Sequence, residues 1–260
     1  SLTNGLGLLE SGDADILALS GGLVHGNMME ILQSGCKVVG ARTPVRPYPV
    51  LVSDNKIQYL PGFAIILCDN KLNRRQLRRS RGGLRVLDSD AFASILGIEE
   101  GPSDPVMKAK WMEELRGAGE IDGFVIPREI YEGANLVSRR HSLLPDGLNE
   151  GDPDFLPSAY SDLIVLLARN RFPKSISKEI SEREGETCWW VQNSMLGSLD
   201  PEMLEKIGVL VRHRQVRSLI KQAEATRDLT LEQVCLDPDG EVIEDEVHVE
   251  IRLEFVSKDG

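Results

Sequence analysis

The chain has 260 residues, with 30 Lys and Arg against 41 Asp and Glu, and a net charge of −11 when His is neutral. This length predicts one to three domains, and a hydrophobic content of 41% is typical of a globular protein. The acidic balance excludes a general nucleic-acid binder, because such proteins neutralise phosphates with Lys and Arg. No apolar run approaches the ~20 residues that cross a bilayer, so we expect no membrane partner.

Apolar runs alternate with helix-like stretches over most of the first 170 residues. Buried strands are predicted at 16–19, 37–40, 63–68, 84–87, 123–126 and 163–167. Helices are predicted at 27–34, 72–80, 91–96 and 106–115. Strands separated by helices indicate parallel or mixed sheets covered by helices, which is the α/β class.

The later part of the chain has a different pattern. Pro, Gly, Asp and Asn are concentrated at 145–157, which we interpret as a linker or surface loop. Asp-Pro at 200–201 is typical of a helix start, and the apolar spacing over 203–211 predicts that helix. Every odd position from Val247 to Phe255 is apolar, which predicts a half-buried antiparallel strand. These features predict a separate α+β unit at the C-terminal end.

Four cysteines lie far apart and form no CxxC pair, so neither a metal knuckle nor a redox dithiol is expected. Cys68 and Cys235 lie within apolar, strand-like runs, where a free Cys acts as a small hydrophobic residue. We interpret all four as thiols of a reducing, cytoplasmic environment. The four histidines show no metal-ligand spacing and no Ser-His-Asp arrangement, so no metal site is predicted and the catalytic residues stay unknown.

The densest charge feature is the segment 74–85, which contains six arginines. On a helix, like charges three and four residues apart repel each other unless anions neutralise them. Guanidinium groups bind carboxylates and phosphates. The candidate ligand-binding residues of this segment are Arg74, Arg75, Arg78 and Arg81. The alternative is a solvated face paired with the protein's many Asp and Glu.

Ser20 is a further candidate ligand-binding residue. With two glycines, it follows a predicted strand, and open α/β sheets bind ligands at the carboxyl ends of strands. A plain tight turn is the alternative, because glycine commonly serves turns.

Five stretches occur in the order of one known family. They are LLESGDADILALS (8–20), VLVS (50–53), PGFAI (61–65), NRRQLRRSRGGL (73–84) and GEIDGFVI (119–126). Together they resemble porphobilinogen deaminase (hydroxymethylbilane synthase), a transferase of tetrapyrrole (heme) biosynthesis. The resemblance implies two open α/β lobes like type II periplasmic-binding-protein domains and a small α+β C-terminal domain. It also implies that the chain starts inside the first lobe.

The resemblance implies a domain division and a ligand as well. The first domain would comprise residues 1–54 with 155–172, the second 55–140, and the C-terminal domain 173–260. The ligand would be a small anionic molecule, a carboxylated pyrrole, and the family's cofactor is a covalently anchored dipyrromethane.

The chain departs from the family at the positions of its chemistry. Leu23 stands where the family has its catalytic Asp, and the region of the anchoring Cys, 219–224, contains no cysteine. Aligned on Gln76 and Leu77, the family's paired arginines fall on 72–73, which are Leu and Asn. The deaminase reaction needs the acid and the thiolate. The alternatives are therefore a non-catalytic protein that binds a small polycarboxylate or another anion, and a protein-interaction module that uses the arginine-rich helix.

Overall fold

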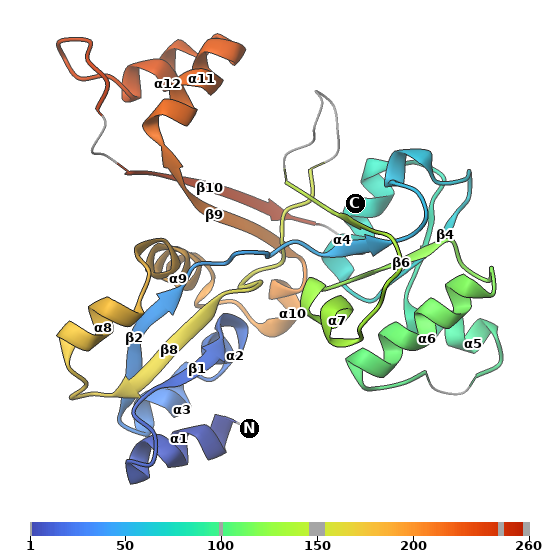
Figure 1. Ribbon diagram of the computed structural model, residues 1–260, viewed down its shortest axis with the longest axis horizontal. Coiled ribbons are helices and arrows are strands. Elements are labelled where there is room, and N and C mark those ends of the chain that lie inside the picture. The colour runs from blue at the N-terminus through green and yellow to red at the C-terminus, as the bar shows by residue number, and fades with distance from the viewer. Residues whose placement is uncertain (1, 99–100, 146–153, 244–246, 257–260) are drawn as a thin grey trace.

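The computed structural model describes residues 2–98, 101–145, 154–243 and 247–256 (Figure 1). The loop predicted at 145–157 lies largely outside the described residues. The described residues form two α/β lobes and a long two-stranded ribbon, whose outer end carries two helices (Figure 1). This arrangement confirms the α/β class with two open lobes.

The first lobe is built on an antiparallel sheet with the strand order β1-β8-β2. Its strands are β1 (Leu17–Ser20), β2 (Cys36–Arg42) and β8 (Ile164–Arg169). Its helices are α1 (Leu2–Ser11), α2 (Gly21–Gly26), α3 (Met28–Gln33), α8 (Lys174–Ile180) and α9 (Arg183–Leu196). β8 occupies the centre although it follows the other two strands by a long stretch of chain. Its continuous apolar run suits that position, because a central strand is covered on both faces.

The second lobe is built on a mixed sheet with the strand order β5-β4-β6-β3-β7. Its strands are β3 (Val50–Val52), β4 (Ile65–Cys68), β5 (Arg85–Leu87), β6 (Gly123–Ile126) and β7 (Arg140–Ser142). Its helices are the 3-10 turn η1 (Ile57–Tyr59), α4 (Lys71–Ser80), α5 (Ser89–Ile95), α6 (Pro105–Gly117) and α7 (Arg128–Gly133). β4 runs parallel to β5 and β6, so the carboxyl ends of these strands share one edge of the sheet.

Alternating side chains of β4 enter two cores on opposite faces of this sheet. Leu67 packs in the core that α5, α6 and α7 contribute to, together with Phe92 and Met112. Ile66 packs on the other face, in the core with Leu77 of α4. The predicted strand at 63–68 starts two residues too early, because Phe63 is 75% exposed with a φ of 63° and the strand begins at Ile65.

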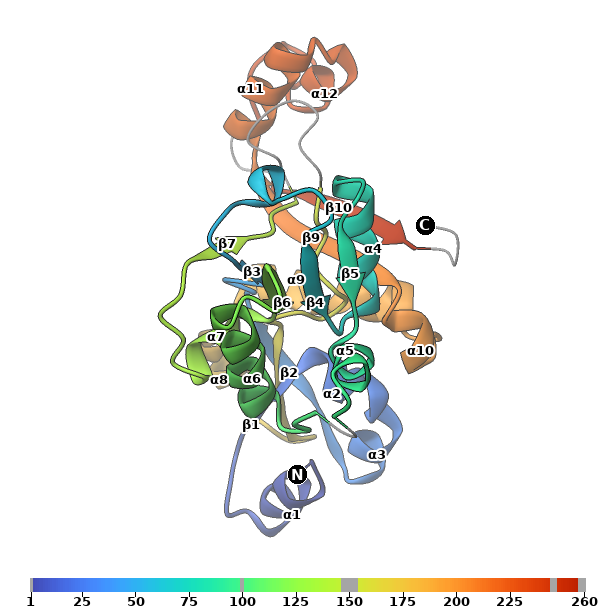
Figure 2. The ribbon, with the colours of Figure 1, turned by 90° about the vertical axis from the view of Figure 1, so that its right-hand side faces the viewer.

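The ribbon consists of β9 (Ile207–Gln215) and β10 (Val247–Phe255), which pair antiparallel over their whole length. It is accompanied by α10 (Pro201–Leu204), α11 (Val216–Thr226) and α12 (Leu229–Val234). Figure 2 shows α11 and α12 at the outer end of the ribbon, far from both lobes.

Two predictions about the ribbon are wrong. The helix predicted over 203–211 ends at Leu204, and a strand follows. Ile207, Val209 and Val211 alternate into the core of the first lobe, and β-branched residues favour a strand there. Cys235 is the C-cap residue of α12 and does not lie in a strand. The residues before it form this helix, whose first turn is stabilised by the side chain of Asp228.

The boundaries of the lobes differ from the predicted division. β3 pairs with β6 and β7 in the sheet of the second lobe, although the division at residue 54 puts it in the first. α9 and β9 share one core with the first lobe, in which Cys188 and Val209 pack with Leu9 and Val165. None of the helices described here is long and apolar enough to cross a membrane.

Candidate functional site

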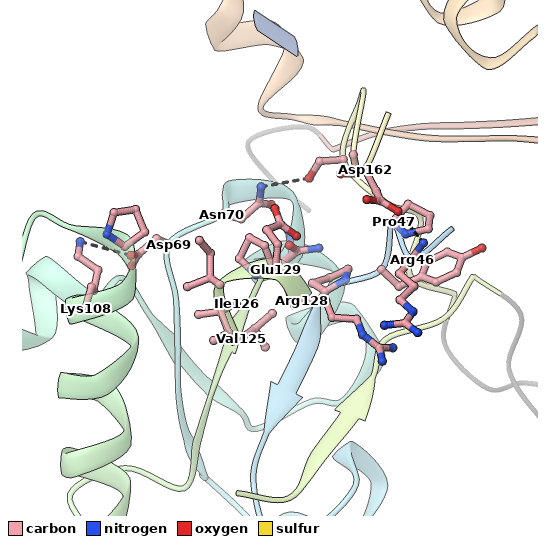
Figure 3. Close-up of a pocket in the computed structure, with 18 of the residues that line it drawn as sticks. Arg46, Pro47, Asp69, Asn70, Lys108, Val125, Ile126, Arg128, Glu129 and Asp162 are labelled. Carbon is pink, nitrogen blue, oxygen red and sulfur yellow. Dashed lines mark hydrogen bonds and ion pairs between the residues drawn. The ribbon is translucent and has the colours of Figure 1, made fainter. Parts of the chain in front are cut away.

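A cavity of about 430 Å³ lies between the two lobes, at the carboxyl ends of β4 and β6 (Figure 3). The second lobe contributes the residues that directly follow these strands, Asp69 and Asn70 after β4 and Pro127 and Arg128 after β6. The first lobe and its connections contribute two segments, 46–49 and 158–162. Ligand sites of open α/β sheets lie at such strand ends.

The floor of this cavity is apolar. Met112, Val125, Ile126 and Ile130 line it together with several prolines. Figure 3 shows Val125 and Ile126 between a lysine on one side and two arginines on the other. A small ligand with an apolar body and a polar group fits such a surface, since most ligand pockets combine apolar walls with few polar groups.

Arg46 and Arg128 form the cationic side of the cavity. The Nε atom of Arg128 lies 2.9 Å from Oε1 of Glu132, and Nη1 of Arg46 lies 3.4 Å from the same oxygen. The hydrogen bond from Arg128, followed by the charges of Arg128 and Arg46, holds the pKa of Glu132 below its ordinary value despite some desolvation. Two guanidinium groups thus share one carboxylate. Because each guanidinium has five N–H donors, this carboxylate leaves donors over for a ligand.

Three acidic side chains also line the cavity, and protein donors engage two of them. Asp162 Oδ2 accepts hydrogen bonds from the backbone N–H groups of Val45 and Arg46, at 2.9 and 2.6 Å. Asp69 accepts the backbone N–H of Ser89 at 2.9 Å and lies 3.4 Å from Nζ of Lys108. The third is Glu129. Protein donors therefore already occupy the carboxylates of Asp69 and Asp162.

Lys108 lies opposite the arginines and joins α6 to the end of β4 (Figure 3). Its Nζ is 3.0 Å from Asp90 and 3.4 Å from Asp69. Desolvation opposes its charge, but the hydrogen bond and charge of Asp90 and the charge of Asp69 raise the pKa of Lys108 above its ordinary value. Lys108 is therefore charged at neutral pH and held by two carboxylates.

Asn70 links the lobes at the mouth of the cavity. As the N-cap of α4 it accepts the backbone N–H of Asn73 at 2.9 Å, and its own Nδ2 donates to Ser158 Oγ at 3.1 Å. An Asn is favoured at this position because its side-chain oxygen satisfies an unpaired donor of the first helical turn. The start of α4 thus contacts the cavity, whereas the arginines lie further along the helix, outside the cavity lining.

The predicted arginines of α4 and of its C-cap position bond within the protein. Arg74 donates to the carbonyl of Cys68 at 2.8 Å and to Asp88 at 2.6 Å. Arg78 donates to the carbonyl of Val86 at 2.6 Å, and Arg81 to that of Ile57 at 2.7 Å. The neighbouring Arg79 pairs with Glu254 of β10. Arg74 and Arg79 thus pair with carboxylates of the protein, as the alternative of a paired arginine face expects, whereas Arg78 and Arg81 bond backbone carbonyls.

Arg75 and Ser20 complete the predicted set. Arg75 is half-buried, and among the described residues its Nη1 has no hydrogen-bond partner. Ser20 is exposed at the N-cap position of α2, where its side chain makes no capping bond. The residues that line the cavity described above include none of Arg74, Arg75, Arg78, Arg81 and Ser20. Their role in ligand binding stays a prediction.

The positions of the family's chemistry can also be located. Leu23, at the place of the catalytic acid, lies in α2 and is 41% exposed. The segment 219–224 lies in α11, at the outer end of the ribbon (Figure 1). All four cysteines are free and buried, and burial raises the pKa of Cys68 and of Cys188 to about 12. A protonated, buried thiol is a poor nucleophile, so neither is suited to anchor a cofactor.

Sequence reasoning did not single out Arg46, Lys108 or Arg128. The sequence could have indicated Arg128 by its position, because it lies two residues after a buried strand, as Asn70 does. No group of three or more His, Cys, Asp and Glu side chains that could hold a metal ion occurs among the described residues.

Comparison with known proteins gives distant likenesses only. No family model matches the chain, and no curated protein matches it either. An ABC transporter structure from Parabacteroides distasonis is 13% identical with a TM-score of 0.38, and the match covers 86% of this chain and 66% of that one. A TRAP periplasmic solute binding protein from Rhodobacter sphaeroides is 12% identical with a TM-score of 0.38, covering 75% and 66%.

A ligand-binding component of an ABC-type import system from Staphylococcus aureus is 12% identical with a TM-score of 0.31, covering 73% of this chain and 58% of that one. The chain thus spans about two thirds or less of the length of these three structures. The fold class given above rests on the sheets of this chain, and the resemblance to porphobilinogen deaminase stays a prediction.

Proposed function

We propose that this protein binds a small organic anion in the cavity between its two lobes. The observation that carries the proposal is the pair Arg46 and Arg128, which share the single carboxylate of Glu132 beside an apolar floor. An apolar or aromatic body would cover the floor, and a carboxylate or a similar group would accept from the guanidinium groups.

The enzymatic alternative is a divergent porphobilinogen deaminase. The buried cysteines and the remote position of 219–224 favour binding without the family's covalent cofactor. A carboxylated pyrrole nevertheless belongs to the class of ligands that the cavity suits, so porphobilinogen is one of the probes to use. The internal partners of the α4 arginines favour the cavity over the arginine-rich helix as the binding surface.

Calorimetric titration tests the proposal with a panel of small mono- and dicarboxylates, aromatic acids and porphobilinogen. For any probe that binds, Arg128→Ala should weaken the affinity about 10- to 100-fold, because a charge-assisted hydrogen bond is worth about 1.5–3 kcal/mol. Arg46→Ala should act in the same direction.

Two controls separate the possible sites. Arg85→Ala removes an exposed arginine of β5 outside the cavity lining and should leave the affinity unchanged. Arg81→Ala tests the arginine-rich helix. If Arg81→Ala abolishes binding while Arg46→Ala and Arg128→Ala do not, the cavity is not the site. Ammonia release from porphobilinogen would instead support the enzymatic alternative.

A further inference from the structure

The apolar residues of β10 point away from the protein. The sequence predicts that they form the buried face of a half-buried strand, but Val249, Ile251, Leu253 and Phe255 are 41%, 46%, 51% and 53% exposed. The alternation of apolar and polar residues along β10 is confirmed. However, the protein covers the polar, even-numbered face of the strand and not the apolar one. On that face Glu250 bonds to the arginines of β9, and Glu254 accepts from Gln76 and Arg79 of α4.

On the apolar face of the ribbon, β9 is covered by the protein, whereas β10 is not. Residues directly opposite in an antiparallel pair point to the same side, so Val211 and its partner Ile251 share a face. Val211 is 8% exposed, since it packs with α9, whose Cys188 donates to the Val211 carbonyl at 3.2 Å. The helix therefore covers the β9 half of the face and leaves the β10 half open.

The outer edge of β10 has no partner strand among the described residues, because this sheet has the order β10-β9. The other edge of the ribbon is occupied, since Val209 donates to the carbonyl of Pro157 at 2.8 Å and Ala159 donates to that of Ile207 at 3.3 Å. A nine-residue edge strand with exposed apolar side chains is a template for pairing with another strand.

The sequence of β10 is complementary to itself. If two copies pair antiparallel about a two-fold axis at Ile251, Glu250 of one copy faces Arg252 of the other, and His248 faces Glu254. On the other side of the strand, Val249 faces Leu253 and Ile251 faces its own counterpart. Moving the axis by one residue to position 250 or 252 would set Glu250 against itself or Arg252 against itself, and like charges directly opposite are destabilising.

We propose that β10 is the contact surface of a symmetric homodimer, in which two copies form a four-stranded sheet with the order β9-β10-β10-β9. The apolar rows of both strands then lie side by side, and the free backbone groups of both edges are paired. Such an isologous contact is closed, because each copy uses the same surface. The inference is independent of the ligand-binding proposal.

Sedimentation of the whole protein tests the contact. The wild-type chain should form dimers, and Val249→Lys should raise the dimer dissociation constant at least tenfold. Val137→Lys is the matched control, because Val137 is 97% exposed on the second lobe and should leave association unchanged. A wild-type protein that is monomeric at about 100 μM would overturn the proposal.

Cross-linking tests the register. Under mild oxidation Ile251→Cys should form disulfide dimers, because paired Cβ atoms lie ~4.5–5.5 Å apart. Leu253→Cys alone should not, since four residues, or ~14 Å, separate it from its own counterpart. A mixture of Val249→Cys and Leu253→Cys chains should cross-link. Equal cross-linking of the three variants alone would show an unspecific apolar contact and contradict the register.

Discussion

Glu250 is the side chain on which three arginines of the ribbon converge. Arg212, Arg214 and Arg252 each place a nitrogen 2.7 Å from one of its carboxylate oxygens. Burial alone would raise the pKa of Glu250, but these hydrogen bonds outweigh it and lower the pKa to about 2. The charged form of Glu250 is therefore stabilised in the folded protein.

This pKa predicts a pH dependence. In the unfolded chain the carboxyl titrates near 4.5, so its contribution to stability is complete above that pH and is lost as the pH falls toward about 2. Glu250→Gln should reduce the free energy of unfolding by on the order of 2 kcal/mol at pH 6, and the difference should shrink toward pH 2. Urea unfolding at several pH values measures it. Glu179→Gln, at an exposed glutamate of α8, should leave the curve unchanged, and a pH-independent difference for Glu250→Gln would contradict the argument.

Single residues also show why the candidate cavity was missed in the sequence. Arg46 and Arg128 are isolated arginines, which look like ordinary surface charges until the sheet order brings their segments together. The arginines of α4 drew attention because of their density. Charge density along a chain does not show what each side chain bonds, and Arg78 bonds a carbonyl of the neighbouring strand.

At the scale of elements, α9 packs directly against the backbone at the end of β2, where the chain leaves the first lobe. A Cβ atom on Gly185 would lie 2.5 Å from the carbonyl carbon of Arg42 and 2.7 Å from the nitrogen of Thr43. Gly185→Ala should therefore displace the helix and lower the free energy of unfolding by about 2 kcal/mol or more. Gly7→Ala is the matched control, because a Cβ there has no neighbour within 4 Å and α1 should gain about 0.5–1 kcal/mol. Equal effects of the two substitutions in thermal unfolding would contradict this packing.

Most strands and helices of the two lobes could be predicted from apolar runs and their spacing. Two elements show the limits of such patterns. The spacing over 203–211 fits one face of a helix, yet its odd positions also fit a strand, and the core of the first lobe decides between them. In β10 the period of two predicts a strand but does not say which face is covered, and the partners of Glu250 and Glu254 place the polar face inward.

At the scale of the whole molecule, Asp162 joins the two segments that connect the lobes, one after β2 and one before β8. Its carboxylate accepts the backbone N–H groups of Val45 and Arg46 in the segment after β2, and its own φ is 54°. Asp162→Ala should lower the free energy of unfolding by about 1–2 kcal/mol. Asp162→Asn keeps an acceptor oxygen and tolerates a positive φ, so it should be milder. Similar losses for both variants in urea unfolding would show that the charge, and not the acceptor, matters.

The central position of β8 has a consequence for the order in which the protein is made. All strands of the second lobe lie between β2 and β8 in the chain, so the ribosome completes that lobe first. The first lobe can fold only after β8, α9 and β9 have been synthesised, because its sheet and core include them. Once residues up to Phe155, which completes the core around Ile66 and Leu77, have left the ribosome, a stalled nascent chain should therefore already protect the second lobe from protease. β1 and β2 should remain open to cleavage.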